Sequence, residues 1–287
     1  MNSLRVYREC VSLLPIQIDI ERVKTVQALV FANQKGGVGK SALLCQFAHH
    51  LKEQGRRVFV IDLDHQANST KALSQHPDTT ISPFSATDVL EGRAIAPPNG
   101  RLGLIPADTG LSSLERIPDH HNAFVTSLRA FLAVCQNAYD VCLIDTNPNP
   151  DIRYAAAMIS ADKVLAPIQL NQEAIDGIGG MFGHPRYGLV KIKATLNPNL
   201  TFMGILPNLV EPTPFQRTNF ETLVRSYPQY LLKLQDAPLQ FAFVQKRSAI
   251  AEAQAGGQFV ADLRKTAARD AWKEIKPVFD IIEKQLL

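Results

Sequence analysis

A glycine-rich segment between an apolar run and an amphipathic run constrains the fold of this chain more than any other feature. The residues from Gln27 to Ala32 are apolar enough to form a buried strand. Apolar residues then recur at helical spacing between positions 43 and 51, and Gly55 provides a stop signal for that helix. The segment between the two reads Lys35-Gly36-Gly37-Val38-Gly39-Lys40-Ser41. Strand, glycine loop and helix therefore follow in the order that builds an anion site at a helix N-terminus.

This segment has the properties of a phosphate-binding loop although it departs from the strict pattern. The pattern G-x-x-x-x-G-K-[ST] requires glycine where this chain has Gln34. Glycines nevertheless let backbone N–H groups point inward, and the following helix adds positive potential, so the loop suits a polyphosphate. The residues predicted to bind the nucleotide are Gly36, Gly37, Val38, Gly39, Lys40, Ser41 and Ala42.

Three side chains of the loop have predicted roles in chemistry. Lys40 is expected to reach the β- and γ-phosphates, and the Ser41 hydroxyl is expected to ligate Mg²⁺. Lys35, at the start of the loop, cannot easily fold back onto the phosphate of its own subunit. We expect it to reach the phosphate bound by a second copy, where it would neutralise charge and make hydrolysis depend on dimerisation.

Acidic side chains follow two of the apolar runs. Asp62 and Asp64 come at the end of the run from Arg57 to Ile61, and alternation along a strand puts both carboxylates on one side. In a parallel sheet that end carries the ligand. Asp64 is predicted to position the attacking water and Asp62 to lie in the hydration shell of Mg²⁺. Asp145 closes the run from Val141 to Ile144 and resembles a Walker B acid, which holds Mg²⁺ through water.

Apolar runs and amphipathic stretches alternate along the chain. The runs predicted as strands are Gln27 to Ala32, Arg57 to Ile61, Val141 to Ile144, Lys163 to Ile168, Thr201 to Leu206 and Leu239 to Val244. The alternation predicts an α/β fold, with one P-loop NTPase domain over residues 26–287 and a mostly parallel twisted sheet flanked by helices. Residues 1–25 are predicted to be an N-terminal extension with a possible short helix around Leu4 to Leu13. Ser74 to Gly100 is predicted to be a loop with one short helical piece at Thr87 to Glu91.

The last part of the chain carries an apolar stripe at helical spacing. The stripe consists of Trp272, Ile275, Phe279, Ile282 and Leu286. Pro277 is predicted to kink this helix or to start a new one. Such a helix can lie on a membrane, but acidic residues dilute the basic face that membrane binding needs. We therefore expect the stripe to pack on the sheet.

Composition narrows the class of protein. No run approaches the roughly 18 apolar residues of a membrane span, and charged residues precede any apolar run, unlike in a signal peptide, so we expect a cytoplasmic protein. The four cysteines lack the spacing of a zinc site or a disulfide framework. A net charge of +3 neither demands nor excludes nucleic acid. The histidines His49, His50, His120 and His121 lack metal-ligand spacing and are predicted to lie on the surface.

Taken together, these motifs resemble the ParA family of plasmid and chromosome partition ATPases, a branch of the deviant Walker group. The resemblance covers nearly the whole chain after residue 26. It includes the loop from Asn33 to Lys40 and the segment Ile61-Asp62-Leu63-Asp64-His65-Gln66-Ala67-Asn68. The chain departs from the usual family pattern at four positions. His65 stands in place of proline, Ala67 in place of glycine and Ala42 in place of threonine or serine, and Asn147 interrupts Asp-Thr-Pro-Pro.

The resemblance implies an ATP- and Mg²⁺-dependent ATPase that forms a sandwich homodimer in the ATP state. It also implies non-specific binding to double-stranded DNA, stimulation by a ParB-like centromere-binding protein, and a place on the nucleoid. Arg217 matches a basic position that the family uses for DNA, and Lys246 with Arg247 lie near another. Separately, the place of Asn208 after a strand makes it a plausible adenine contact.

Three other functions remain open from the sequence. A MinD-like membrane-cycling regulator shares the ATP site but needs a basic terminal helix. An iron-sulfur reductase of the nitrogenase iron-protein type needs cysteines in loops, whereas Cys142 lies in a predicted strand and Cys45 in a predicted helix. The third is an ATP-gated scaffold for another cargo, which the sequence cannot name.

Overall fold

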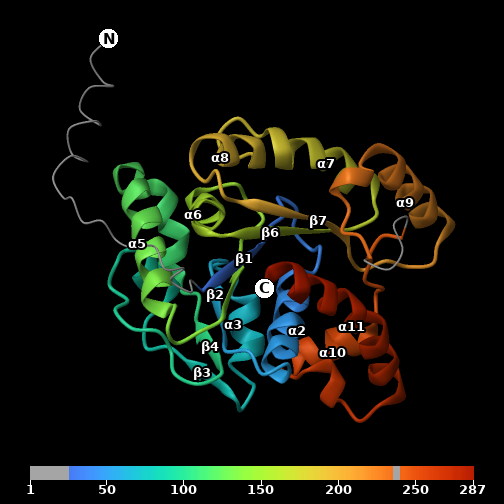
Figure 1. Ribbon diagram of the computed structural model, residues 1–287, viewed down its shortest axis with the longest axis horizontal. Coiled ribbons are helices and arrows are strands. Elements are labelled where there is room, and N and C mark those ends of the chain that lie inside the picture. The colour runs from blue at the N-terminus through green and yellow to red at the C-terminus, as the bar shows by residue number, and fades with distance from the viewer. Residues whose placement is uncertain (1–25, 235–239) are drawn as a thin grey trace.

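The computed structural model describes residues 26–234 and 240–287. The predicted extension over residues 1–25, with its possible helix around Leu4 to Leu13, lies outside the described residues. The rest of the chain forms a seven-stranded sheet in the order β3-β4-β2-β5-β1-β6-β7, and every neighbouring pair is parallel. Helices cover both faces of this sheet (Figure 1). The predicted α/β class with a mostly parallel sheet is confirmed.

Five of the six predicted strands belong to this sheet. The strands are β1 (Gln27–Phe31), β2 (Val58–Asp62), β3 (Thr79–Ile81), β4 (Leu102–Ile105), β5 (Val141–Asp145), β6 (Lys163–Ile168) and β7 (Thr201–Pro207). The segment predicted as a loop contains β3, an edge strand of three residues, and β4 begins two residues after that segment ends. The helical piece expected in the segment is α4 (Ala86–Leu90), which begins with a capping box between Ser85 and Asp88.

The sixth predicted strand, Leu239 to Val244, is wrong. Its described residues form no strand of the sheet and make only scattered backbone contacts beside β7. The backbone of Leu232 already donates to the carbonyl of Ile205 on that edge, at 3.0 Å. The segment therefore pairs with Leu232 and with the end of β7 instead of extending the sheet.

The helices divide between the two faces of the sheet, as Figure 1 shows. One core lies between the sheet and the buried residues of α4, α5 (His121–Cys135), α6 (Ile152–Ser160) and α8 (Leu189–Thr195). The other core lies between the sheet and the buried residues of α2 (Lys40–Glu53), α3 (Asn68–Leu73) and α11 (Thr266–Leu286). The remaining helices are α7 (Gln172–Gly183), α9 (Pro214–Ser226) and α10 (Ser248–Ala255). Four 3-10 turns complete the described elements: η1 (Thr109–Arg116), η2 (Pro118–His120), η3 (Pro228–Tyr230) and η4 (Val260–Asp262).

Helix α11 packs on the sheet as expected. Ile275, Phe279, Ile282 and Leu286 are buried in the core that α2 shares. The helix runs through Pro277 without ending there, so no new helix begins at the proline. In the part of the chain that the structure describes, no helix is both long and apolar enough to cross a membrane.

Two of the histidine predictions are wrong. His49 and His50 are buried, not on the surface. The ring of His50 lies against Phe47, Trp272 and Phe279, with centroids about 6 Å apart, because α11 closes over this part of α2. Burial lowers the pKa of His49 to about 3, which keeps its ring neutral, and burial also lowers the pKa of His50. His120 is exposed, as expected.

Candidate nucleotide site

The parallel sheet brings the ends of five strands together at one edge. The glycine loop follows β1, Asp62 and Asp64 end or follow β2, and Asp145 ends β5. Segments after β6 and β7 complete the same edge. This is the carboxyl edge, where parallel α/β folds place their ligands.

Two glycines give the loop its shape. Gly37 and Gly39 have φ of 76° and 78°, the left-handed region that side chains disfavour. A Cβ added to Gly39 would also lie 2.7 Å from the amide nitrogen of Asn208, whereas one on Gly37 would meet nothing within 4 Å. Gly39 is the residue just before α2, so the loop turns its backbone toward the anion-binding end of that helix.

The ammonium of Lys40 is hydrogen-bonded to backbone carbonyls at the start of the loop. Its Nζ donates to the carbonyl of Asn33 at 3.3 Å and to the carbonyl of Lys35 at 3.4 Å. Burial lowers the pKa of Lys40, while the carboxylates of Asp145 and Asp64 raise it. The lysine therefore stands between the loop and the acids, and its predicted phosphate contact stays a prediction.

Side-chain amides tie the loop to the two neighbouring strands. Asn33 donates to the carbonyl of Pro167 on β6 at 2.6 Å and accepts from the backbone of Lys35 at 2.9 Å. Gln169 donates to the carbonyl of Gly37 at 2.9 Å, and Asn208 donates to the carbonyl of Val38 at 2.8 Å. The sequence analysis assigned no role to Asn33 or Gln169, although each comes directly after or near the end of a predicted strand.

Asp145 has the surroundings of a metal-binding acid. It is fully buried, its Oδ2 accepts a 2.6 Å hydrogen bond from Ser69, and its Oδ1 has no partner. Burial raises the pKa of Asp145, and the nearby hydroxyls of Ser41 and Ser69 lower it. An unpaired buried carboxylate oxygen beside a serine hydroxyl fits the hard oxygen ligands that Mg²⁺ prefers. Ser41 and Asp145 are therefore brought together as predicted.

Asp62 is adjacent to Asp145 but is engaged with the protein. The two residues are register partners across β2 and β5. Oδ2 of Asp62 accepts from the backbone and hydroxyl of Thr70, both at 2.8 Å, and Oδ1 accepts from the backbone of Asp64 at 3.1 Å. Burial and the nearby Asp145 raise the pKa of Asp62 to about 7. Its predicted place in the Mg²⁺ hydration shell stays a prediction, and its contacts attach α3 to the sheet.

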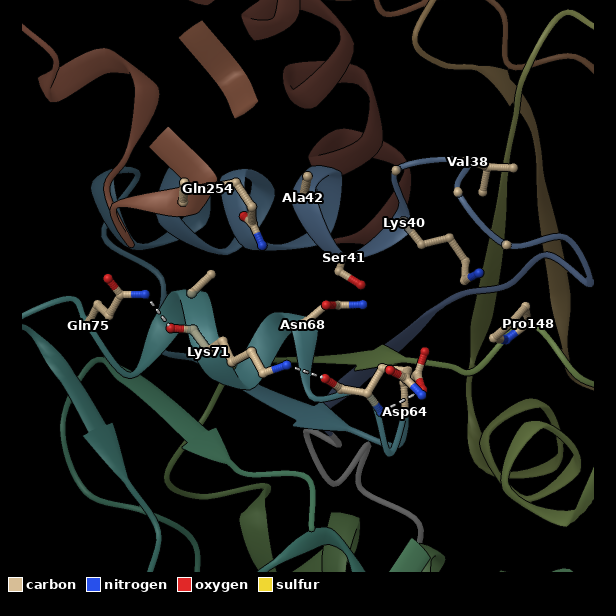
Figure 2. A pocket seen from close by; sticks show the side chains of 16 residues that line it. Val38, Lys40, Ser41, Ala42, Asp64, Asn68, Lys71, Gln75, Pro148 and Gln254 are labelled. Atoms are coloured by element: carbon tan, nitrogen blue, oxygen red, sulfur yellow. Dashed lines mark hydrogen bonds between the residues drawn. The ribbon is translucent and has the colours of Figure 1, made fainter. Parts of the chain in front are cut away.

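A pocket of about 700 Å³ opens between the loop and α3. Figure 2 shows Lys40, Ser41 and Ala42 on one wall and Asp64, Asn68 and Lys71 on the other. The Asp64 carboxylate is largely buried and accepts from the backbone of Gln66 at 3.0 Å. The full lining consists of Gly36, Gly37, Val38, Gly39, Lys40, Ser41, Ala42, Asp64, Gln66, Asn68, Lys71, Ala72, Gln75, Pro148, Gln254 and Ala255. The loop residues predicted to bind the nucleotide, Gly36 to Ala42, all line it.

Asn208 faces a second cavity of about 360 Å³, which shares Gly39 and Ala42 with the first. The shared residues make the two cavities neighbours along the start of α2. The adenine contact of Asn208 stays a prediction.

Lys35 is not among the residues that line the phosphate pocket. Its ammonium pairs with Glu173 at the start of α7, and both side chains are exposed. An exposed ion pair of this kind is worth little energy, so the lysine is free to exchange partners. Its predicted reach to a second subunit stays a prediction.

The three basic candidates for DNA lie on and near two helices. Arg217 is exposed on α9, and Lys246 and Arg247 precede α10. Lys246 pairs with Glu211 at 3.0 Å and Arg247 with Glu274 at 2.8 Å. Sequence reasoning did not find these carboxylates, which any phosphate would have to displace.

The sequence is similar to a family model and to several named proteins. The family model described as AAA domain (AAA_31) matches residues 26–202. Protein IncC of Escherichia coli is 35% identical over 269 residues, which is 90% of this chain and 70% of IncC. The chromosome-partitioning ATPase Soj of Thermus thermophilus is 30% identical over 208 residues, which is 70% of this chain and 77% of Soj.

One similar solved structure contains a nucleotide analogue and magnesium. Cobyrinic acid a,c-diamide synthase from Mycobacterium smegmatis, solved with a bound ATP analogue and magnesium, has a TM-score of 0.61 and 28% identity. The match covers 70% of this chain and 80% of that one. Nucleotide and Mg²⁺ binding thus occurs in a protein of similar fold and sequence.

Proposed function

The chain belongs to the ParA family of partition ATPases, and we propose that it hydrolyses ATP in the phosphate pocket to drive DNA segregation. The observation that carries the proposal is the meeting of Lys40, Ser41 and Asp64 around one cavity at the carboxyl edge of the sheet, with the buried Asp145 close to Lys40 and Ser41. Each has a different part in phosphoryl transfer, and the ends of β2 and β5 and the start of α2 supply all of them to one place.

Mg²⁺, when bound with ATP, would neutralise charge on the β- and γ-phosphates. Ser41 and Asp145 would hold it, since the hydroxyl and the unpaired Oδ1 are the oxygens available there. Lys40 would exchange its two carbonyl acceptors for phosphate oxygens, which are stronger acceptors because they are charged. Asp64 would accept a hydrogen bond from the attacking water and orient it toward the γ-phosphate.

Dimerisation in the ATP state is the second part of the proposal. Lys35 lies outside the pocket of its own subunit and is exposed. In a homodimer that joins two phosphate pockets face to face, this lysine would reach the partner's nucleotide. Hydrolysis would then remove the charge that holds the dimer together.

DNA binding and a stimulating partner form the third part. Arg217, Lys246 and Arg247 would contact the phosphates of double-stranded DNA without reading its sequence. A ParB-like protein would stimulate hydrolysis and release the DNA, and the protein would work on the nucleoid in the cytoplasm. The membrane-cycling alternative is less well supported, because the apolar face of α11 is buried in the core.

The test is DNA binding at several salt concentrations with ATP, with ADP and without nucleotide. Each phosphate contact should steepen the dependence of log K on log salt by about 0.9. ATP-dependent binding that weakens steeply with salt supports the proposal, and the Lys40→Ala variant should bind equally weakly in all three conditions. Absence of ATP-dependent binding by the unmodified protein would refute the DNA role and leave the ATPase site standing.

A further inference from the structure

Two of the residues that depart from the family pattern belong to one hydrogen-bond network beside the phosphate pocket. Asn147 donates to Oδ2 of Asp151 at 2.9 Å, and Nε of Arg153 donates to the same oxygen at 3.0 Å. The guanidinium of Arg153 also lies 3.1 Å from Nδ1 of His65. His65 and Asn147 are therefore connected, although 82 positions of sequence separate them.

Asp151 and Arg153 hold one end of this network in place. Asp151 precedes α6 and caps it, since its Oδ1 accepts from the backbone of Arg153 at 3.0 Å. The side chain of Arg153 is only 6% exposed and that of Asp151 only 13%. The guanidinium therefore has one well-defined direction toward His65.

This direction determines which nitrogen of His65 carries the proton. Nδ1 of His65 lies nearer to this guanidinium, at 3.1 Å, than to Oδ1 of Asp64, at 3.5 Å. A guanidinium has only donors, so Nδ1 accepts from it, and in a neutral imidazole the proton then sits on Nε2. Nε2 lies 3.0 Å from Nε2 of the Gln66 side chain, a nitrogen that changes places with the amide oxygen when the group is turned by 180°. The oxygen and nitrogen of an amide are assigned from their hydrogen bonds, and here the Nε2–H group requires the oxygen of Gln66. The NH₂ group of Gln66 is then the end left for another acceptor.

The backbone of Gln66 is also held at the edge of the pocket. Its N–H donates to Oδ1 of Asp64 at 3.0 Å, and its carbonyl accepts from Nζ of Lys71 at 3.0 Å. Figure 2 shows Lys71 reaching along the pocket toward this turn beside Asp64. Gln66 lines the same cavity as Lys40 and Asp64.

We propose that His65 and Arg153 are positioning residues that aim the amide NH₂ of Gln66 at an oxygen of the terminal phosphate. This inference rests on the proposed ATPase function and adds a donor to it. The contact would strengthen as charge develops on that phosphate during transfer, so it should act on turnover more than on binding.

The test replaces His65 with asparagine. The oxygen of an asparagine side chain can take the place of Nδ1 and accept from Arg153, but the side chain has no group at the Nε2 position to hold Gln66. We expect the His65→Asn variant to lose about five- to tenfold in kcat, with KM for ATP and the affinity for ADP unchanged within about twofold. His120→Asn, at an exposed histidine on η2, is the matched control and should leave all three unchanged.

A double-mutant cycle with Gln66→Ala separates positioning from a general structural effect. If His65 acts through Gln66, the His65→Asn substitution should have no further effect on kcat in the Gln66→Ala background. An equal loss in both backgrounds, an unchanged kcat, or a rise in KM alone overturns the inference. Absence of ATP turnover by the unmodified protein would refute the proposed function itself, and this inference with it. His65 is exposed, so both single variants should fold, and thermal unfolding checks this.

Discussion

Replacing Gly39 with alanine should cost far more stability than the same change at Gly37. Both glycines have φ near 77°, and a left-handed conformation costs an alanine about 1–2 kcal/mol. At Gly39 the new Cβ would also lie 2.7 Å from the amide nitrogen of Asn208. To make room, Asn208 would have to give up its 2.8 Å hydrogen bond to Val38, and an unsatisfied buried group costs about 1–3 kcal/mol.

The expected losses are therefore about 2–5 kcal/mol for Gly39→Ala and about 1–2 kcal/mol for Gly37→Ala. Both variants gain the same entropy advantage of alanine over glycine in the unfolded chain, so this effect cancels in the comparison. Urea denaturation without nucleotide measures the free energy of unfolding of each. In the Asn208→Ala background the cost of Gly39→Ala should fall to that of Gly37→Ala. Equal costs in the original background would refute the reasoning that Asn208 closes on the loop at Gly39.

Three further predictions concern α3 and the two acids beneath it. Ala67 has φ of 58° where the family usually has glycine, so Ala67→Gly should raise the free energy of unfolding by about 0.5 kcal/mol. The control Ala251→Gly, at an exposed position of α10, should lower it by about 1 kcal/mol. A loss of stability in both variants would contradict the strain at Ala67. The pKa of Asp62 rises from 3.8 to about 7 on folding, so the native state keeps a proton that the unfolded state has released. Asp62 should therefore stabilise the fold below pH 4 and lose that contribution as pH rises to 7. In Asp62→Asn the free energy of unfolding should decline less steeply over this pH range. Identical slopes of unfolding free energy against pH in the two proteins would refute the raised pKa of Asp62. Ser69→Ala removes the 2.6 Å hydrogen bond that orients Asp145, so calorimetry should show that Mg²⁺-dependent ADP binding weakens by about tenfold. Ser74→Ala, at an exposed serine, is the control. An unchanged dependence of ADP binding on Mg²⁺ would argue against orientation of Asp145 by Ser69.

The sequence was most informative for strands of five residues or more. β1, β5 and β6 lie in the middle of the sheet and their apolar runs were recognised within one residue. β3 has three residues at the sheet edge and none of them is buried, so it leaves no apolar run to detect. Leu239 to Val244 has such a run, but its described residues, 240–244, pack beside β7 without joining the sheet, because other backbone already occupies that edge.

In the candidate site, the sequence identified residues that lie next to a strand and missed contacts between residues far apart in the chain. The loop, Asp64 and Asp145 were identified because each lies at the end of a recognisable strand. The bonds from Ser69 to Asp145 and from Arg153 to His65 join residues 76 and 88 positions apart, and only the fold brings them together. The burial of His50 under α11 is hidden for the same reason, since the helix that covers it comes more than 200 residues later.

ATP turnover by the Asp64→Ala variant, measured together with its mass in the presence of ATP and Mg²⁺, tests whether Asp64 positions the attacking water. We expect turnover to fall by about 10²–10⁴-fold while ATP stays bound and the dimer accumulates, because Asp64 positions the water and does not hold the nucleotide. Lys40→Ala should instead lose productive nucleotide binding and remain monomeric. An Asp64→Ala protein as active as the unmodified one would contradict the account.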